Sequence, residues 1–398
     1  MKPRVAVLFD NLGPYHMARL AAAAKRVHLL AVEQKTKSAE YEWNPVKKTP
    51  FARVTLLDPT DALVNLRVER AAVSKALDDF QPEVIAIPGW SSRQAKVGLM
   101  WALEHAVPVV VMSDSQEIDF PRSRYKEWLK SRYIALCAAG LVGGTPHLAY
   151  LSKLGMPPSQ IQTGYDVVDN AYFERCTNEL RTKHKELAKE LGLVRPFFLC
   201  AARFVEKKNL PTLIKAFAQY RDMAMTHHTL WDLVILGDGS LRTILEMMAK
   251  ERTPPNSVHF PGFIQYAELP RYYGAASCFV LPSTTEQWGL VVNEAMASGL
   301  PVLVSERCGC AQDLVENGKN GFTFNPYDVD ELARLMMWIA SPDCDRVAMG
   351  TASLEIIDRW SPETFASGLE AAVQTALQSQ GRPAGLLDHA LLHALAHR

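Results

Sequence analysis

The chain has 398 residues, of which 48% are hydrophobic and 22% are charged. These proportions are typical of soluble globular proteins, and the length exceeds one ordinary hydrophobic core, so we expect two domains. The 43 basic and 43 acidic side chains balance, which gives no electrostatic reason to expect a nucleic-acid partner. The seven cysteines are scattered and odd in number, which argues against a disulfide framework.

The first half of the chain alternates short apolar runs with helical patterns. Helices are predicted at about 15–25, 61–80 and 91–105, and strands at 4–9, 27–32, 54–57, 83–87 and 107–112. This alternation predicts a parallel sheet covered on both faces. No run of about 18 apolar residues occurs, and the first strand begins almost at the N-terminus. We therefore expect neither a spanning helix nor a signal peptide, and a cytoplasmic location.

Candidate ligand contacts in this half follow the predicted strands, because ligands of such sheets gather at the carboxyl ends of the strands. Gly13 lies in the first strand-to-helix turn, where a glycine lets a ligand approach the backbone and a helix N-terminus favours anions. His16, one turn later, is a second candidate, with simple packing as the alternative. Trp90 follows the fourth strand, and Asp114 follows the fifth, where a polar strand cap is the alternative.

Two stretches mix basic and aromatic residues. Residues 34–50 are either a loop that binds an acceptor substrate or a loop that only extends into solvent. Residues 121–133, PRSRYKEWLKSRY, predict a basic amphipathic helix. Such a helix lies on an anionic membrane or holds an anionic acceptor, or is a charged outer face over an ordinary core stripe.

In the second half, a charged helix at 178–191 and a buried strand at 196–201 precede Arg203 and Lys208. Arginine offers a fork of donors and lysine a point charge, a combination suited to a diphosphate, with two surface charges as the alternative. Another predicted strand, 233–236, ends at the glycine turn of Gly237.

Residues 279–304, FVLPSTTEQWGLVVNEAMASGLPVLV, predict a strand, a loop, a short helix and a second strand. Glu286 lies in the loop, Gly289 and Leu290 open the helix, and Glu294 lies within it. Eight helical positions span roughly 12 Å, so one carboxylate is placed for a sugar and the other for a ribose, with a pyrophosphate at the helix N-terminus between them. In the alternative, Glu286 faces solvent and Glu294 merely favours the helix.

The stretch resembles the donor-binding segment of retaining GT-B glycosyltransferases of family 4, of the bacterial group 1 type. These proteins carry two glutamates separated by seven residues, the pattern of Glu286 and Glu294, and the match continues through Pro301, Gly309 and 318–322. The resemblance implies an α/β protein of GT-B architecture, with two doubly wound Rossmann-like parallel-sheet domains facing across a cleft. Residues 1–175, joined by a C-terminal helix at about 363–398, are then the acceptor-binding domain, and 176–362 the nucleotide-sugar-binding domain.

The resemblance also implies a reaction. A hexosyl group passes from a UDP- or GDP-sugar to a hydroxyl of a saccharide, lipid-linked or small-molecule acceptor, with retained anomeric configuration. Arg203 and Lys208 then hold the diphosphate and Glu286 orients the sugar, while backbone groups of Phe263 and Ile264 bind the base. Asp114 departs from the family, which often has a histidine at this position near the donor sugar and the acceptor.

Two other features bear on the chemistry. The tripeptides Asp328–Asp330 and Asp343–Asp345 have the Asp-x-Asp pattern of some metal sites, but both lie at predicted helix starts, where aspartate is a favoured cap. We therefore expect no metal and no cofactor beyond the nucleotide sugar. The alternatives to a transferase are a nucleotide-sugar epimerase of the same architecture and a catalytically silent nucleotide-sugar binder.

Overall fold

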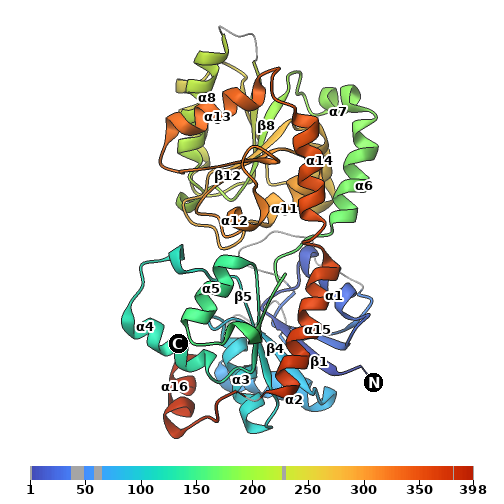
Figure 1. The fold of residues 1–398 in the computed structure, drawn as a ribbon, viewed down its shortest axis with the longest axis vertical. Helices are drawn as coiled ribbons and strands as arrows, with labels where there is room; N and C mark the ends of the chain where they lie inside the picture. The colour runs from blue at the N-terminus through green and yellow to red at the C-terminus, as the bar shows by residue number, and fades with distance from the viewer. Residues whose placement is uncertain (1, 37–48, 58–64, 226–229, 380, 398) are drawn as a thin grey trace. The chain divides into compact units, whose positions relative to one another are not determined.

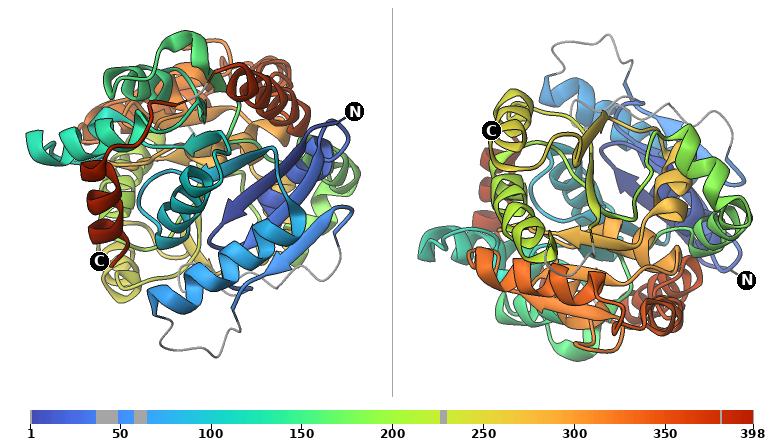
Figure 2. Two further views of the ribbon diagram at one scale, coloured as in Figure 1. Left: turned by 90° about the horizontal axis from the view of Figure 1, so that it is seen from below. Right: turned by 90° about the horizontal axis from the view of Figure 1, so that it is seen from above.

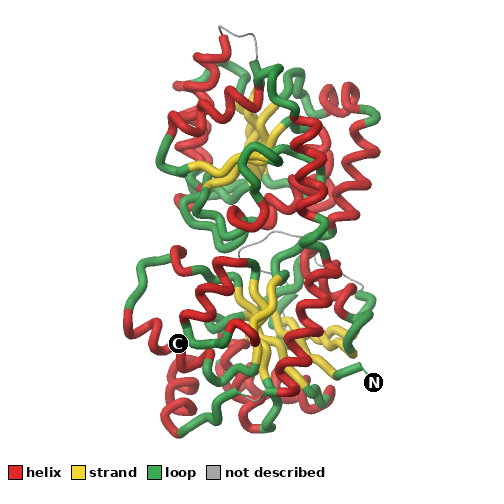
Figure 3. Tube along the Cα trace, in the orientation of Figure 1, coloured by secondary structure: helices red, strands yellow, loops and turns green. Residues whose placement is uncertain are grey.

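A computed structural model of the chain describes residues 2–36, 49–57, 65–225, 230–379 and 381–397. The chain forms two compact units, one made of Met1–Val168 with Ser361–Arg398 and the other of Asp169–Trp360. Each unit contains one sheet with helices packed against it (Figures 1, 2 and 3). The prediction of an α/β fold with two parallel sheets is confirmed. Most of the stretch 34–50 lies outside the described residues.

The first unit is built on a seven-stranded sheet in the order β3-β2-β1-β4-β5-β6-β7, with every neighbouring pair parallel. Its strands are β1 (Arg4–Phe9), β2 (His28–Glu33), β3 (Ala52–Thr55), β4 (Val84–Pro88), β5 (Val109–Ser113), β6 (Ala139–Val142) and β7 (Ile161–Thr163). Its α-helices are α1 (Pro14–Ala23), α2 (Leu66–Phe80), α3 (Arg93–Glu104), α4 (Arg124–Ile134), α5 (Thr145–Lys153), α15 (Pro362–Gln378) and α16 (Leu386–Ala396).

The second unit is built on a six-stranded sheet in the order β10-β9-β8-β11-β12-β13, again parallel throughout. Its strands are β8 (Phe197–Ala201), β9 (Asp232–Leu236), β10 (Val258–Gly262), β11 (Cys278–Leu281), β12 (Val302–Ser305) and β13 (Gly321–Phe324). Its α-helices are α6 (Asn170–Arg181), α7 (His184–Glu190), α8 (Leu210–Met225), α9 (Arg242–Arg252), α10 (Leu269–Ala275), α11 (Leu290–Ala297), α12 (Ala311–Leu314), α13 (Val329–Ala340) and α14 (Arg346–Ile357).

The central strands are buried along their length because helices cover both of their faces, which explains their continuous apolar runs. In both sheets the chain first moves outward in one direction and then returns past its first strand. As a result β1 lies between β2 and β4, and β8 lies between β9 and β11. The gap at this reversal of strand order is where open parallel sheets bind their ligands.

The structure differs from the sequence prediction at 178–191, where one helix was expected and two are found. Helix α6 ends at Arg181, and Lys183 then leaves helical geometry, with φ of −118° and ψ of 32°. The single-helix prediction was wrong because neither glycine nor proline marks the break. The boundaries between units also differ: residues 169–175 belong to the second unit, since Asp169 caps α6, and residues 361–362 begin α15 in the first.

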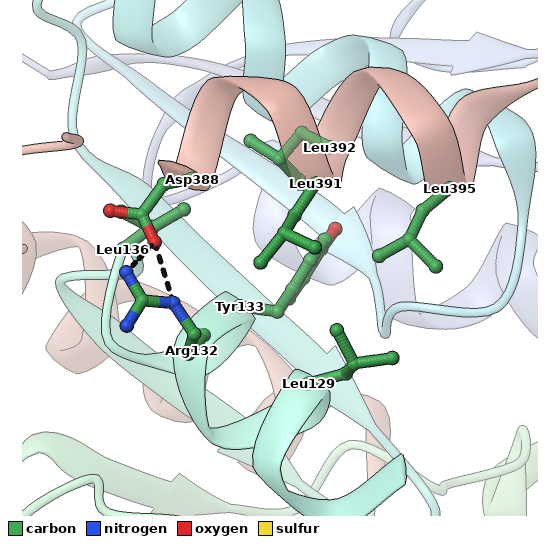
Figure 4. A pocket seen from close by; sticks show the side chains of 8 residues that line it. All are labelled: Leu129, Arg132, Tyr133, Leu136, Asp388, Leu391, Leu392 and Leu395. Atoms are coloured by element: carbon green, nitrogen blue, oxygen red, sulfur yellow. Dashed lines mark hydrogen bonds and ion pairs between the residues drawn. The ribbon is translucent and has the colours of Figure 1, made fainter. Parts of the chain in front are cut away.

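The chain's last two helices complete the first unit. Helix α15 lies beside α1 (Figure 1), and buries Phe365, Leu369 and Val373. The C-terminal helix expected at about 363–398 is thus two helices, of which the second, α16, packs on α4. Figure 4 shows leucines of α16 pointing toward α4 over a shallow pocket, which is lined by Leu129, Tyr133, Leu391, Leu392 and Leu395 among others.

Asp388 fastens α16 to α4. Its Oδ1 atom accepts hydrogen bonds from Nε and Nη2 of Arg132 at 3.0 and 2.6 Å, and Oδ2 accepts from Arg382 at 2.7 Å. Burial acts to raise the pKa of this carboxyl, but the Gly385 N–H and the two guanidinium groups hold the pKa below its ordinary value. The C-terminal helix therefore carries an ionised, hydrogen-bonded anchor in addition to its leucines.

Candidate active site

The candidate residues of the second unit meet where its strand order reverses. Arg203 and Lys208 follow β8, and Glu286 follows β11, the strand hydrogen-bonded directly to β8. Because the two strands are parallel, their carboxyl ends open at the same edge of the sheet. A pair of loops separated by nearly eighty residues in sequence is thereby brought together.

Lys208 and Glu286 form an ion pair between these loops, through Nζ and Oε2. The lysine and glutamate side chains are only 12% and 15% exposed, so the pair is largely shielded from water. The Ser283 hydroxyl lies 3.3 Å from the same Oε2 and donates to it. The sequence predicted both residues but assigned them to different parts of a ligand, whereas the structure places them in contact with each other.

The loop that carries Lys208 is fixed by Asn209. This residue adopts left-handed backbone geometry, with φ of 54°, and its side-chain amide donates to the carbonyls of Pro282 at 3.1 Å and Pro326 at 2.8 Å. The backbone N–H of Thr284 donates to the Lys207 carbonyl at 2.9 Å. The loop after β8 is thus tied to the loop after β11 by backbone groups, independently of the ion pair.

Glu286 is held from its other side by the segment before α12. Its carbonyl accepts from the Gly309 N–H at 3.0 Å, and the carbonyl of Trp288 accepts from the Cys310 N–H at 3.1 Å. Cys308 and Cys310 are both buried, and burial raises the pKa of the Cys308 thiol well above its ordinary value. Cys308 therefore fills space behind the loop as a neutral thiol, and Cys310 is buried beside it.

Helix α11 begins beside the ion pair. Gly289 precedes it with φ of 112°, a left-handed conformation that L side chains rarely adopt. A Cβ atom at Gly289 would lie 3.2–3.4 Å from the side chains of Leu281, Cys310 and Glu286, so the glycine also allows close packing. Leu290 is the first helical residue and is half-buried. The positive end of the α11 dipole consequently lies close to Glu286 and Lys208.

Glu294 lies in the middle of α11 and is fully buried. Its Oε2 atom accepts a hydrogen bond of 2.6 Å from the hydroxyl of Tyr273 on α10, which is fully buried as well. Tyr273 could not be predicted as a site residue, because no sequence pattern distinguishes a functional tyrosine in a short apolar helix from one that only packs in the core. It is the polar neighbour of this carboxylate that the sequence reasoning missed.

The residues predicted to hold the base lie at the neighbouring strand ends. The N–H of Gly237, after β9, donates to the Gly262 carbonyl of β10 at 2.8 Å. Gly237 has φ of 124°, and a Cβ there would lie 1.9 Å from the Ala202 carbonyl oxygen, so no other residue fits this turn. Phe263 and Ile264 follow β10 directly and are half-buried, with neither side chain sequestered in the core.

In the first unit, Gly13 and Trp90 follow β1 and β4, at that sheet's own reversal of strand order. His16 serves local structure: its Nδ1 atom accepts from the Gly13 N–H at 3.1 Å, and its ring packs edge-on against Phe9. Burial and the charge of Arg19 hold the pKa of His16 well below its ordinary value. His16 is therefore a neutral imidazole that closes the first turn of α1. Trp90 packs against Tyr150, with ring centroids 6.4 Å apart.

Asp114 lies near a second carboxyl group that the sequence reasoning did not single out. It follows β5, and Asp166 follows β7, two strands away in the same sheet. Asp166 is buried, and burial together with the negative charge of Asp114 raises the pKa of Asp166 well above its ordinary value, against the opposing charge of Arg19. The position of the family's histidine is thus occupied by an acid that interacts with another acid.

The two Asp-x-Asp tripeptides are used as helix caps. Asp328 accepts from the Glu331 N–H at 2.8 Å at the start of α13, and Asp345 accepts from the Ala348 N–H at 2.9 Å at the start of α14. Across the described ranges, no group of three or more histidine, cysteine, aspartate or glutamate side chains is arranged to hold a metal ion.

Comparisons with known proteins agree on the second unit. Residues 183–354 match the family model described as glycosyl transferases group 1. The sulfoquinovosyl transferase SQD2 of Arabidopsis thaliana is 36% identical over 131 residues, which cover 32% of this chain and 25% of that protein. A GDP-mannose-dependent alpha-(1-6)-phosphatidylinositol monomannoside mannosyltransferase of Mycobacterium tuberculosis is 30% identical over 186 residues, 44% of this chain and 46% of that protein. The matched region thus spans about half or less of these relatives.

Solved structures match both units. The Anabaena protein HepE, in complex with UDP and glucose, superposes with a TM-score of 0.70 at 18% identity, covering 92% of this chain and 98% of that one. Sucrose-phosphate synthase from Thermosynechococcus elongatus gives a TM-score of 0.71 at 18% identity, covering 93% and 97%. At this identity the likeness establishes the fold, which is GT-B.

The raised pKa of Asp166 leads to a pH-dependent prediction for Asp166→Asn. Well below the ordinary aspartate pKa of about 3.9, the carboxyl is protonated in both folded and unfolded chains, so it has no differential effect. As the pH rises the unfolded chain ionises freely while the folded chain resists, and each pKa unit of upward shift costs about 1.4 kcal/mol of stability. We expect the melting temperature of Asp166→Asn, relative to wild type, to increase between pH 4.5 and pH 8. Asp79→Asn, at an exposed side chain of α2, is the control. If the melting temperatures of wild type and Asp166→Asn changed in parallel with pH, the raised pKa of Asp166 would be contradicted.

Proposed function

We propose, because residues 183–354 belong to the family of glycosyl transferases group 1, that the chain is a retaining hexosyltransferase. Its donor is a nucleoside diphosphate sugar with uracil or guanine as the base, and its acceptor is a hydroxyl of a saccharide, a lipid-linked saccharide or a small molecule. The relatives support this class of donor, since one is named as GDP-mannose-dependent and one structural neighbour holds UDP and glucose.

The Lys208–Glu286 ion pair beside the N-terminus of α11 is the observation that carries the proposal. In the structure the charge of Lys208 is balanced by Glu286, and both side chains are largely shielded from water. An incoming diphosphate offers more negative charge than one carboxylate and competes for Lys208, while Glu286 is then available to sugar hydroxyls. A single contact is therefore exchanged for two contacts to the donor.

The proposed chemistry uses charge stabilisation. When the bond between the anomeric carbon and the diphosphate oxygen breaks, negative charge accumulates on the leaving diphosphate. Arg203, Lys208 and the N-terminus of α11 stabilise that charge more strongly in the transition state than in the bound donor. The departing phosphate takes the proton of the acceptor hydroxyl, which attacks from the same face of the sugar, so the configuration is retained without a covalent intermediate.

Further residues orient the two substrates in this proposal. Glu294 binds the ribose, and the turns at Gly237, Phe263 and Ile264 hold the base through backbone groups. In the first unit, Gly13 approaches the donor while His16, Trp90 and Asp114 contribute to the acceptor side. A neutral His16 contributes through hydrogen bonding, and Asp114 supplies the polar group at the end of β5.

We also propose that turnover needs no divalent metal. In this proposal Arg203 and Lys208 supply the two positive charges that balance the diphosphate. Asp328 and Asp345 are committed to capping α13 and α14, which removes the two sequence patterns that suggested metal ligands.

A peripheral contact with the inner face of a membrane is the proposed role of 121–133. Within the described residues, no helix combines the length and apolar character needed to cross a bilayer. Tyr125 and Trp128 of α4 are 63% and 44% exposed and stack on each other, and Phe120 just before the helix is 65% exposed. Arg124 and Lys126 are exposed on the same helix. Exposed aromatic and basic side chains together suit an anionic lipid surface.

A donor panel tests the proposed function. UDP-, GDP- and ADP-sugars are screened for thermal stabilisation, and the stabilising donor is then incubated with hydroxyl acceptors in the presence of EDTA. We expect one base to raise the melting temperature by mass action, and glycoside formation to be unaffected by the chelator. If the sugar nucleotide were isomerised in the absence of an acceptor, the chain would be an epimerase. If the donor were bound but neither hydrolysed nor transferred, the chain would be a catalytically silent binder. Activity lost in EDTA and restored by Mn²⁺ would contradict metal independence.

Lys208→Ala should reduce turnover by about 10² or more, as expected for loss of one group that stabilises developing charge. Lys207→Ala is the matched control, because its backbone carbonyl holds Thr284 whatever its side chain, and it should keep near-normal turnover. Steady-state kinetics with the identified donor measure both variants. If Lys208→Ala turned over like Lys207→Ala, Lys208 would have no part in the mechanism.

The membrane proposal is tested by charge reversal on α4. Each basic side chain near an anionic bilayer contributes about 1 kcal/mol, so Arg124→Glu/Lys126→Glu should reduce binding at least tenfold. Co-sedimentation with vesicles of phosphatidylcholine and phosphatidylglycerol measures the bound fraction, with Arg67→Glu/Lys75→Glu on α2 as the control. Equal binding by the two double variants would refute the role of α4.

A further inference from the structure

The buried carboxylate of Glu294 depends on a neighbouring phenol. A fully buried ionised carboxylate is costly unless hydrogen bonds satisfy it. The Tyr273 hydroxyl donates to Oε2 of Glu294 at 2.6 Å, a length typical of a hydrogen bond to a charged acceptor. The same hydroxyl lies 3.5 Å from the Val291 carbonyl in the first turn of α11. Tyr273 therefore joins α10 to the helix that carries Glu294.

The ring of Tyr273 is fixed by aromatic neighbours. It packs edge-on against Phe173 of α6, with centroids 5.8 Å apart and an interplanar angle of 88°. It also contacts Phe279 of β11 in a tilted arrangement, with centroids 6.0 Å apart and an interplanar angle of 44°. All three side chains are fully buried. A ring held from two sides has one rotamer, so its hydroxyl has a fixed direction.

A second tyrosine is affected by the negative charge of Glu294. Tyr266 packs edge-on against Phe173 at 5.5 Å and stacks on Tyr172 at 5.3 Å. Burial and then the charge of Glu294 raise the pKa of Tyr266 well above its ordinary value. Tyr172, Phe173, Tyr266 and Tyr273 thus form one aromatic cluster, in which Tyr273 bonds to Glu294 and Tyr266 is affected by the charge of Glu294.

We propose that Tyr273 is a positioning residue for the donor, acting through Glu294 on the ribose of the nucleotide. The inference rests on the proposed function, in which Glu294 accepts hydrogen bonds from ribose hydroxyls. A glutamate side chain has three rotatable bonds, and binding a diol requires its carboxylate to be placed before the ligand arrives. The Tyr273 hydroxyl fixes one oxygen atom and so sets the orientation of the whole carboxylate.

Tyr273→Phe tests the proposal because it removes the hydroxyl and keeps the ring. Calorimetry compares the binding of UDP and GDP with that of their 2′,3′-dideoxy counterparts. Wild type should prefer the ribonucleotide of the correct base, and Tyr273→Phe should lose about tenfold of that preference. In kinetics the KM for the donor should rise about tenfold with kcat within twofold, because the ribose contact is the same in the ground and transition states.

Tyr272→Phe is the matched control, since Tyr272 is adjacent on α10 and half-buried, and it should behave as wild type. An unchanged ribose preference in Tyr273→Phe overturns the proposal, and so does an equal loss of affinity for the ribo- and dideoxynucleotides, which marks a merely structural role. A wild-type chain that binds neither UDP nor GDP overturns the proposed function itself. These results are distinguishable, because the first two require nucleotide binding by wild type.

Discussion

One ion pair, between Lys208 and Glu286, organises the candidate site. Its partners lie 78 residues apart and meet because β8 and β11 are adjacent in the sheet. The pair is largely shielded from water, in surroundings where an unpaired charge of either sign is unfavourable, so each residue depends on the other for its balancing charge. The surrounding features protect this arrangement: Asn209 joins the two loops, Gly289 allows α11 to begin close by, and the segment before α12 supports Glu286 from behind.

Much of this arrangement could be predicted from the sequence. Hydrophobic periodicity and the positions of glycine and proline predicted the two-sheet α/β fold, the glycine turns, and the order of strand, loop, helix and strand at 279–304. The resemblance to the group 1 glycosyltransferases is confirmed for 183–354. Contact between Lys208 and Glu286 could not be predicted, because hydrophobic pattern identifies strands without specifying which strands pair. The hydrogen-bond partner of Glu294 could not be predicted either. Tyr273 belongs to another helix, and only the structure shows that its hydroxyl points toward Glu294.

The two units illustrate different uses of the same residue types. In the second unit, charged side chains near the strand ends pair with each other across loops. In the first, His16 bonds to the backbone three residues earlier, and Trp90 packs against Tyr150. Short-range bonds of this kind are easily formed by any histidine one turn into a helix, so residue type and position alone do not separate a cap from a ligand contact.

The attachment of α16 to α4 has a practical consequence. Arg132 lies on the helix whose outer surface is basic and aromatic, and its guanidinium is engaged by Asp388 from the far end of the chain. Any fusion, tag or proteolytic cut that disturbs the last helix will also loosen the inner side of α4. Variants of the protein that differ only after residue 380 should therefore be compared with care whenever adsorption to lipid or to surfaces is measured.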